Sequence, residues 1–130
     1  MRLLLDTHVL LWSLADPRRL PADVVVAIES SENEILFSAA SIWEIAIKSQ
    51  VSRADFGVDA QTIIAAAHET RFTELAIGAE HAAAVARLPP HHKDPFDRLL
   101  IAQAMTEPAR LITADKALAE YSDDLVWLIA

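Results

Sequence analysis

Four carboxylic acids that lie far apart along the chain could together hold divalent cations. Asp6 and Asp115 each end a short apolar run that is typical of a buried strand. Glu44 and Asp97 are expected in the first turns of two helices. In an open parallel sheet, strand carboxyl ends and helix amino ends face the same side, and ligands bind there. Four acids at that edge would need cations, which is the pattern of a metal-dependent phosphodiesterase pocket.

Each acid also has a structural interpretation. Asp is a favoured N-cap, so Asp6 could cap a helix that begins near His8, and this alternative stays open. Glu44 follows Ser41 by three residues, the spacing of a capping box. The surrounding helix is apolar on nearly every side, with Glu44 and Lys48 as its one polar stripe. Pairing with Lys48 or a place in a metal cleft would each explain an acid there.

The segment around Asp97 also resembles a helix start. Asp94 is the expected N-cap and Pro95 the first helical residue, with Asp97 in the first turn. Capping explains Asp94 well, but Asp97 shares a face with apolar residues of a buried helix. We therefore expect Asp97 to be a ligand and Asp94 to support it.

Thr113 and Asp115 end the strand that precedes the last expected helix. Alternate residues of a strand point the same way, so both side chains would share one face. Asp115 could cap the following helix, or lie opposite Asp6 on an adjacent strand as a fourth carboxylate. Thr113 would then orient a carboxylate or a water.

Strands alternate with helices along the whole chain, which predicts a parallel sheet covered on both faces. The expected strands cover residues 2–6, 35–38, 72–77, 110–113 and 125–128. The expected helices cover residues 7–14, 23–31, 41–51, 59–69, 80–88 and 94–106, with one more after Asp115. A loop is expected over residues 53–58. The chain contains only two glycines, which excludes both a glycine-rich phosphate loop and a dinucleotide fingerprint.

The composition is that of one ordinary folded domain over residues 1–130. Hydrophobic residues make up 53% and charged residues 23%, enough apolar side chain for a real core. There is no cysteine and no long apolar run, so we expect no membrane contact and a cytoplasmic location. The net charge of −8 argues against a nucleic-acid substrate, unless bound cations reverse the local field.

The histidines and tryptophans are expected to be structural or solvated. His91 and His92 are adjacent and lack the one-turn spacing of a two-histidine metal site, so they read as a solvated loop. His68 and His81 are expected on helix surfaces. All three tryptophans lie in aliphatic runs, which favours core or dimer contacts over base stacking.

With the acids placed, the chain resembles the PIN-domain nucleases, and among them the VapC-type toxins of bacterial toxin–antitoxin pairs. Four segments carry the resemblance: residues 3–8 (LLLDTH), 38–45 (SAASIWEI), 94–104 (DPFDRLLIAQA) and 111–115 (LITAD). Any one segment is weak evidence, but their order and spacing together are specific, and no acid is missing.

The resemblance implies a three-layer α/β/α sandwich with a central, mainly parallel sheet. It also implies Mg²⁺ or Mn²⁺ held by Asp6, Glu44, Asp97 and Asp115, endonucleolytic cleavage of RNA, homodimers, and a cognate antitoxin. One ion could bind tightly and a second arrive with the substrate, at roughly 3.5 to 4 Å from the first. The alternative function is a catalytically silent binding module of the same fold that acts through an antitoxin or regulatory partner.

Overall fold

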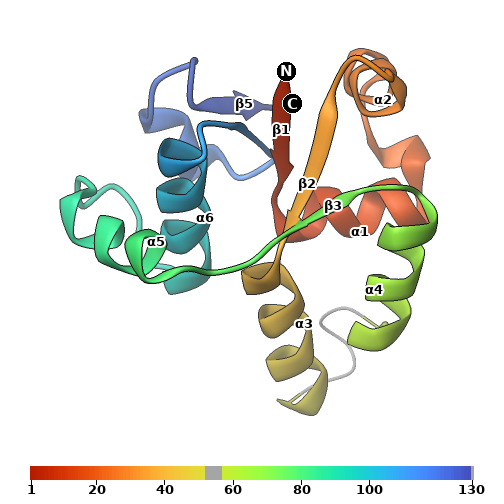
Figure 1. The fold of residues 1–130 in the computed structure, drawn as a ribbon, viewed down its shortest axis with the longest axis horizontal. Helices are drawn as coiled ribbons and strands as arrows, with labels where there is room; N and C mark the ends of the chain where they lie inside the picture. Colours follow the sequence, from red (N-terminus) through yellow and green to blue (C-terminus); the bar gives the residue numbers. More distant parts are fainter. Residues whose placement is uncertain (52–56, 130) are drawn as a thin grey trace.

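A parallel five-stranded sheet forms the centre of the molecule, in the order β3-β2-β1-β4-β5 (Figure 1). The fold is given by a computed structural model that describes residues 1–51 and 57–129. All four strand pairings are parallel, and β1 is the central strand. The strands are β1 (Arg2–Leu5), β2 (Glu34–Ser38), β3 (Thr73–Leu75), β4 (Arg110–Thr113) and β5 (Val126–Leu128).

Helices cover both faces of this sheet, as the alternating pattern predicted. The α-helices of the described residues are α1 (Thr7–Ala15), α2 (Ala22–Glu29), α3 (Ala39–Val51), α4 (Ala60–Glu69), α5 (Ala79–Ala84) and α6 (Pro95–Thr106). Short 3₁₀ helices are η1 (Pro17–Arg19), η2 (Val85–Arg87) and η3 (Lys116–Glu120). In Figure 1, α1, α2 and α4 lie on one side of the sheet, and α5 and α6 on the other. The predicted three-layer α/β/α architecture is therefore confirmed.

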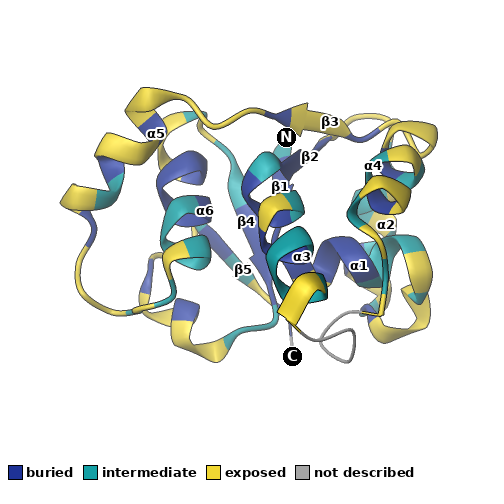
Figure 2. Ribbon diagram, turned by 90° about the horizontal axis from the view of Figure 1, so that it is seen from below, coloured by how far each residue is buried: buried dark blue, intermediate teal, exposed yellow. Residues whose placement is uncertain are grey.

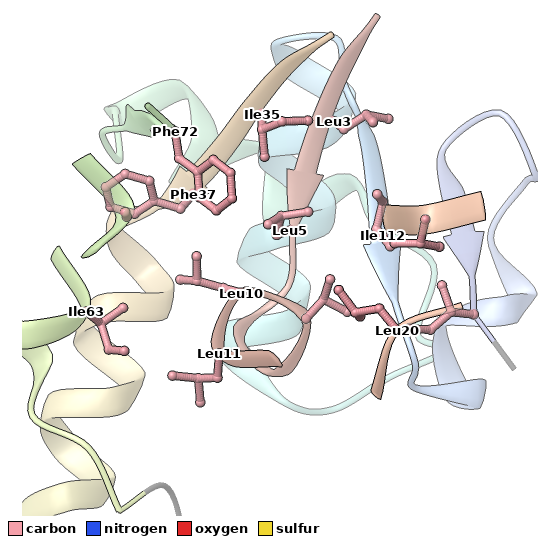
Figure 3. Close-up of a cluster of buried hydrophobic side chains, with 14 of the residues drawn as sticks. Leu3, Leu5, Leu10, Leu11, Leu20, Ile35, Phe37, Ile63, Phe72 and Ile112 are labelled. Carbon is pink, nitrogen blue, oxygen red and sulfur yellow. The ribbon is translucent and has the colours of Figure 1, made fainter. Parts of the chain in front are cut away.

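Alternation along the strands builds two separate cores. Leu3 and Leu5 pack with Phe37 and Ile112 against α1, α2 and α4, as Figure 3 shows for this cluster. Leu4 points to the opposite face and joins the cluster that includes α6. Every residue of β1 after Arg2 is buried, which explains its continuous apolar run, since parallel sheets bury both faces. Burying one such leucine contributes roughly 1.5 to 3 kcal/mol.

The carboxyl ends of β1, β2 and β4 lead directly into the elements that surround one edge of the sheet. Seen toward that edge in Figure 2, α3 stands between α1 and α6. Helix α3 also contacts both of these helices. Helices α1, α3 and α6 therefore surround the carboxyl edge of the sheet, while the amino ends of the strands lie at the opposite edge.

Several predicted boundaries differ from the structure. Helix α3 begins at Ala39, directly after β2, because the Ser38 hydroxyl accepts the Ala40 N–H at 2.9 Å and acts as the cap. The helix expected over residues 80–88 is α5 followed by η2, and the helix expected after Asp115 is the 3₁₀ helix η3. The strand expected over residues 72–77 is limited to β3. Most of the loop expected over residues 53–58 lies outside the described residues.

Among the residues that the structure describes, no helix is both long and apolar enough to span a bilayer.

Candidate functional site

Asp6 lies at the centre of the carboxyl edge, immediately after the central strand. Its backbone N–H continues the sheet by donating to the carbonyl of Ile112 on β4 at 3.0 Å. The Oδ1 atom accepts the Val9 N–H at 2.8 Å and so caps α1. The Oδ2 atom accepts the Thr113 hydroxyl at 2.5 Å. The capping interpretation of Asp6 is confirmed, and its role as a metal ligand stays a prediction; the second oxygen faces the adjacent strand end.

Glu44 reaches the same edge from α3, and only 4% of it is exposed. Its Oε1 accepts the Thr7 hydroxyl at 2.6 Å, while Lys48 Nζ lies 2.7 Å from Oε2. The expected capping box with Ser41 is wrong, because α3 starts at Ala39 and Glu44 therefore lies in the second turn. The predicted pair of Glu44 with Lys48 is present. The hydrogen bond from Thr7 also connects Glu44 to the residue that follows Asp6.

Asp97 approaches from the first turn of α6, as expected. Asp94 caps this helix and accepts the N–H groups of Phe96 and Asp97 at 2.8 and 3.3 Å. The capping prediction for Asp94 is confirmed. The carboxylate of Asp97 is bound by His92, whose Nε2 lies 2.7 Å from Oδ2.

Asp115 closes the site on the β4 side. Its N–H donates to the Thr113 hydroxyl at 3.0 Å, and its Oδ1 accepts the Ala117 N–H at 2.9 Å, which makes it the cap of η3. Thr113 therefore connects the two acids of adjacent strands, donating to Asp6 and accepting from Asp115. The Asp115 side chain is 41% exposed, so it lies at the mouth of the site, whereas Asp6 lies at its floor.

His92 is the site residue that sequence reasoning missed. It was expected in a solvated loop, but its side chain is only 17% exposed, and Nε2 lies 3.4 Å from Asp115 Oδ2 as well as near Asp97. His92, Asp97 and Asp115 offer ligand atoms within 4.8 Å of one another. The available signal was its place two residues before Asp94, which anchors the loop to the start of α6. Helical spacing rules do not apply to a loop residue, and they gave the wrong answer.

The charges of these acids interact. Burial raises the pKa of Asp6 from 3.8 to about 6; the hydrogen bonds from Thr113 and Val9 lower it, while the charges of Glu44 and Asp115 raise it further. Burial also raises the pKa of Asp97 to about 6 against the lowering effect of His92, and the charges of Asp94 and Asp6 add to the rise. Asp6 and Asp97 are thus close enough to other acids for the neighbouring charges to raise their pKa values, and both carboxylates are largely shielded from solvent.

This donor set fits a hard divalent cation. Carboxylate oxygens are the preferred protein ligands of Mg²⁺ and Mn²⁺. A cation would also offset the burial and the neighbouring negative charges that raise the pKa values of Asp6 and Asp97. Several of the oxygens are already oriented by hydroxyl and backbone donors, as supported metal ligands usually are.

The expectation for His81 is wrong. His81 is 7% exposed rather than on the surface; its Nδ1 accepts the Gly78 N–H at 2.8 Å, and Nε2 lies 2.5 Å from Glu107. This contact links α5 to the end of α6. Both ring nitrogens have a hydrogen-bonding partner, so the polar ring can be buried. Trp43 was expected in the core or at a dimer contact. It is 56% exposed, so it is not a core residue and the dimer contact stays a prediction; its ring meets Phe96 edge-on at a centroid distance of 5.2 Å.

Comparison with known sequences decides the family. The sequence model of the PIN domain matches residues 3–124, nearly the whole chain. The chain belongs to the PIN-domain family. A curated relative, "Ribonuclease VapC22" of Mycobacterium tuberculosis, is 31% identical over 118 residues, which cover 91% of this chain and 90% of that protein.

Solved structures share the PIN fold at low sequence identity. VapBC2 of Rickettsia felis, bound to a DNA fragment from its promoter, contains a chain with a TM-score of 0.71 and 14% identity, with 100% of both chains covered. VapBC-1 of nontypeable Haemophilus influenzae gives 0.63 at 14% identity over 98% of each chain. A toxin–antitoxin complex of Klebsiella pneumoniae gives 0.62 at 21% identity over 95% of this chain and 94% of that chain. These likenesses establish the architecture alone.

Proposed function

We propose that this PIN-domain protein is a metal-dependent endoribonuclease and the toxin of a VapBC-type pair. Asp6, Glu44, Asp97 and Asp115 would hold Mg²⁺ or Mn²⁺. The observation that supports this best is the electrostatic one. Buried Asp6 experiences the charges of Glu44 and Asp115, and Asp97 experiences that of Asp6. Several ionised carboxylates close together in a desolvated place cost free energy, and a bound cation would lower that cost, which supports the proposal of a cation site.

The other polar residues of the site keep these oxygens in place. Thr113 donates to Asp6 and accepts from the Asp115 N–H, which fixes the two strand-end acids relative to each other. Thr7 orients Glu44 in the same way from the start of α1. Asp94 holds the first turn of α6 and thereby the position of Asp97. Oriented ligands lose little freedom when a cation binds, which favours binding.

A bound divalent cation would polarise a water nucleophile and offset the charge that develops on the phosphodiester. No side chain then has to act as a covalent nucleophile. The cation also addresses the net charge of −8, because it is the cation that would contact the phosphate. Such a nuclease would work in the cytoplasm, where its RNA substrate is found.

The proposed partners follow from the relatives. The curated relative is named a ribonuclease, and the structural neighbours are toxin–antitoxin complexes. Exposed apolar side chains on α2 and α3 offer contact area for an antitoxin or a second copy of the chain: Val26, Trp43 and Val51 are 68%, 56% and 81% exposed. Apolar side chains exposed on a helix can serve as contacts of an interface.

RNA cleavage by the purified protein tests the proposal. We would incubate total cellular RNA with the protein in Mg²⁺, Mn²⁺ or EDTA, beside the variants Asp6→Asn and Asp97→Asn. Asp59→Asn is the matched control, because Asp59 is an exposed cap of α4 outside the site. Discrete fragments are expected from the wild type and the control with metal, and none from the site variants or in EDTA.

Two results would contradict the proposal. One is metal-dependent cleavage that persists in full in both site variants. The other is no cleavage by folded, inhibitor-free protein in either metal, which would favour the alternative of a PIN-fold binding module. Mass spectrometry of the preparation establishes whether an antitoxin has co-purified.

A further inference from the structure

His92 approaches the acidic site from a loop that no sequence motif marked. Its Nε2 lies 2.7 Å from Asp97 Oδ2 and 3.4 Å from Asp115 Oδ2. The two carboxylates come from different elements, α6 and the end of β4. One ring nitrogen therefore faces two acids that the fold brings together independently of the loop.

The loop that carries His92 is held by the rest of the fold. The Arg98 guanidinium donates to the carbonyls of Val85, Pro89 and His92 at 3.1, 3.3 and 3.1 Å. On the other side, His91 Nδ1 lies 3.1 Å from Glu120. These contacts at residue 92 and in the segment before it restrict the loop backbone, so the ring is delivered to the acids at low entropic cost.

The spacing of these atoms suits ligands of one ion. Neighbouring ligand atoms of an octahedral Mg²⁺-sized or Mn²⁺-sized ion, at about 2.1 Å from the metal, are roughly 3 Å apart. The two contacts of Nε2 lie on either side of that value. Metal ligation by Nε2 requires the neutral imidazole to carry its proton on Nδ1. Exchange of the carboxylate hydrogen bonds for a metal bond therefore moves the ring little, but it shifts the ring proton from Nε2 to Nδ1.

We propose that His92 is a nitrogen ligand of the divalent cation, together with Asp97 and Asp115. This inference rests on the proposed function, since it concerns the same site. The inference adds a ligand outside the four acids and predicts which metal ions the site prefers. Mg²⁺ prefers oxygen ligands and keeps its waters, whereas first-row transition ions such as Mn²⁺, which also bind carboxylates, accept an imidazole nitrogen more readily than Mg²⁺ does. His92 thus shifts the preference of the site from Mg²⁺ toward such ions.

Mn²⁺ binding tests the assignment without any use of activity. Pulsed electron paramagnetic resonance of the Mn²⁺-loaded wild type is expected to show coupling to a histidine ¹⁴N nucleus, and the coupling is expected to vanish in His92→Ala. By titration, His92→Ala should lose about tenfold in Mn²⁺ affinity, with Mg²⁺ affinity within about twofold of the wild type. The control His68→Ala changes an exposed histidine of α4 that lies 3.8 Å from Glu74, outside the site, and it should retain the wild-type values.

The outcomes separate this inference from the proposed function. Mn²⁺ that binds the wild type but not Asp97→Asn, without any ¹⁴N coupling, would leave the carboxylate site intact and overturn the role of His92. An equal loss of Mg²⁺ and Mn²⁺ affinity in His92→Ala would overturn the selectivity. Folded wild type that binds neither ion would overturn both proposals. The wild-type spectrum decides ligation even if His92→Ala folds poorly.

Discussion

Replacing Asp6 by Asn should stabilise the metal-free protein near neutral pH. Asp6 is 5% exposed and lies near two other acids, so its ionised form is disfavoured in the folded state. Asn can keep the main contacts, because it is also a good N-cap and its amide can donate to the Thr113 hydroxyl. The substitution therefore removes a charge while leaving the packing nearly unchanged.

The magnitude follows from the pKa of Asp6. Its rise from 3.8 to about 6 corresponds to about 3 kcal/mol of unfolding free energy. Between these values the folded state keeps a proton that the unfolded chain has lost. The stabilising contribution is therefore complete below pH 3.8 and is lost as the pH rises through 6. Asn carries no such dependence, so the advantage of the variant should grow from pH 4 to pH 7 and then remain constant.

Urea unfolding in EDTA at several pH values measures this difference. The control Asp59→Asn alters an exposed cap, so its stability relative to the wild type should be nearly independent of pH. If the difference between Asp6→Asn and the wild type stayed flat from pH 4 to pH 7, the charge of Asp6 would not be penalised by the fold. The electrostatic argument for a cation site would then fail at its main residue.

Three further predictions concern the same edge of the sheet and the core beneath it. Mg²⁺ or Mn²⁺ at a hundredfold excess over Kd should stabilise the wild type by about 2.7 kcal/mol and so raise its thermal midpoint. The midpoint of Asp6→Asn should hardly change. An equal rise in both proteins would place the bound ion elsewhere. Thr113→Val removes the donor to Asp6 and should cost about 1 to 3 kcal/mol at pH 8 but less at pH 4, where Asp6 is protonated; Thr113→Ser should restore most of the loss in urea unfolding. Gln103 is fully buried and accepts the Ser38 hydroxyl at 2.5 Å, so Gln103→Leu should cost about 1 to 3 kcal/mol by leaving that hydroxyl without its partner. Unchanged stability there would mean that Ser38 finds another acceptor.

Local sequence signals predicted the layered fold well, because they depend on short-range rules. The apolar run before Asp6 indicated a strand buried on both faces, and alternation with helices indicated a parallel sheet. Asp94 and Pro95 marked the start of α6 within one residue. The same rules erred at α3, where the Ser41–Glu44 spacing matched a capping box but Ser38 is the cap, since a strand that runs directly into a helix supplies its own cap.

The sequence by itself determined that Asp6 and Asp115 follow strands and that Asp97 begins a helix, and hence that these acids could share one edge; it placed Glu44 one turn too early in α3. Only the tertiary structure decided what they contact. Thr113 bridges Asp6 and Asp115 because β1 and β4 are neighbours in the sheet order, although more than a hundred residues separate them along the chain. His92 joins Asp97 because Arg98 folds its loop back over α6. Such contacts depend on strand order and loop closure, which are set by the packing of the whole chain and not by the residues nearby.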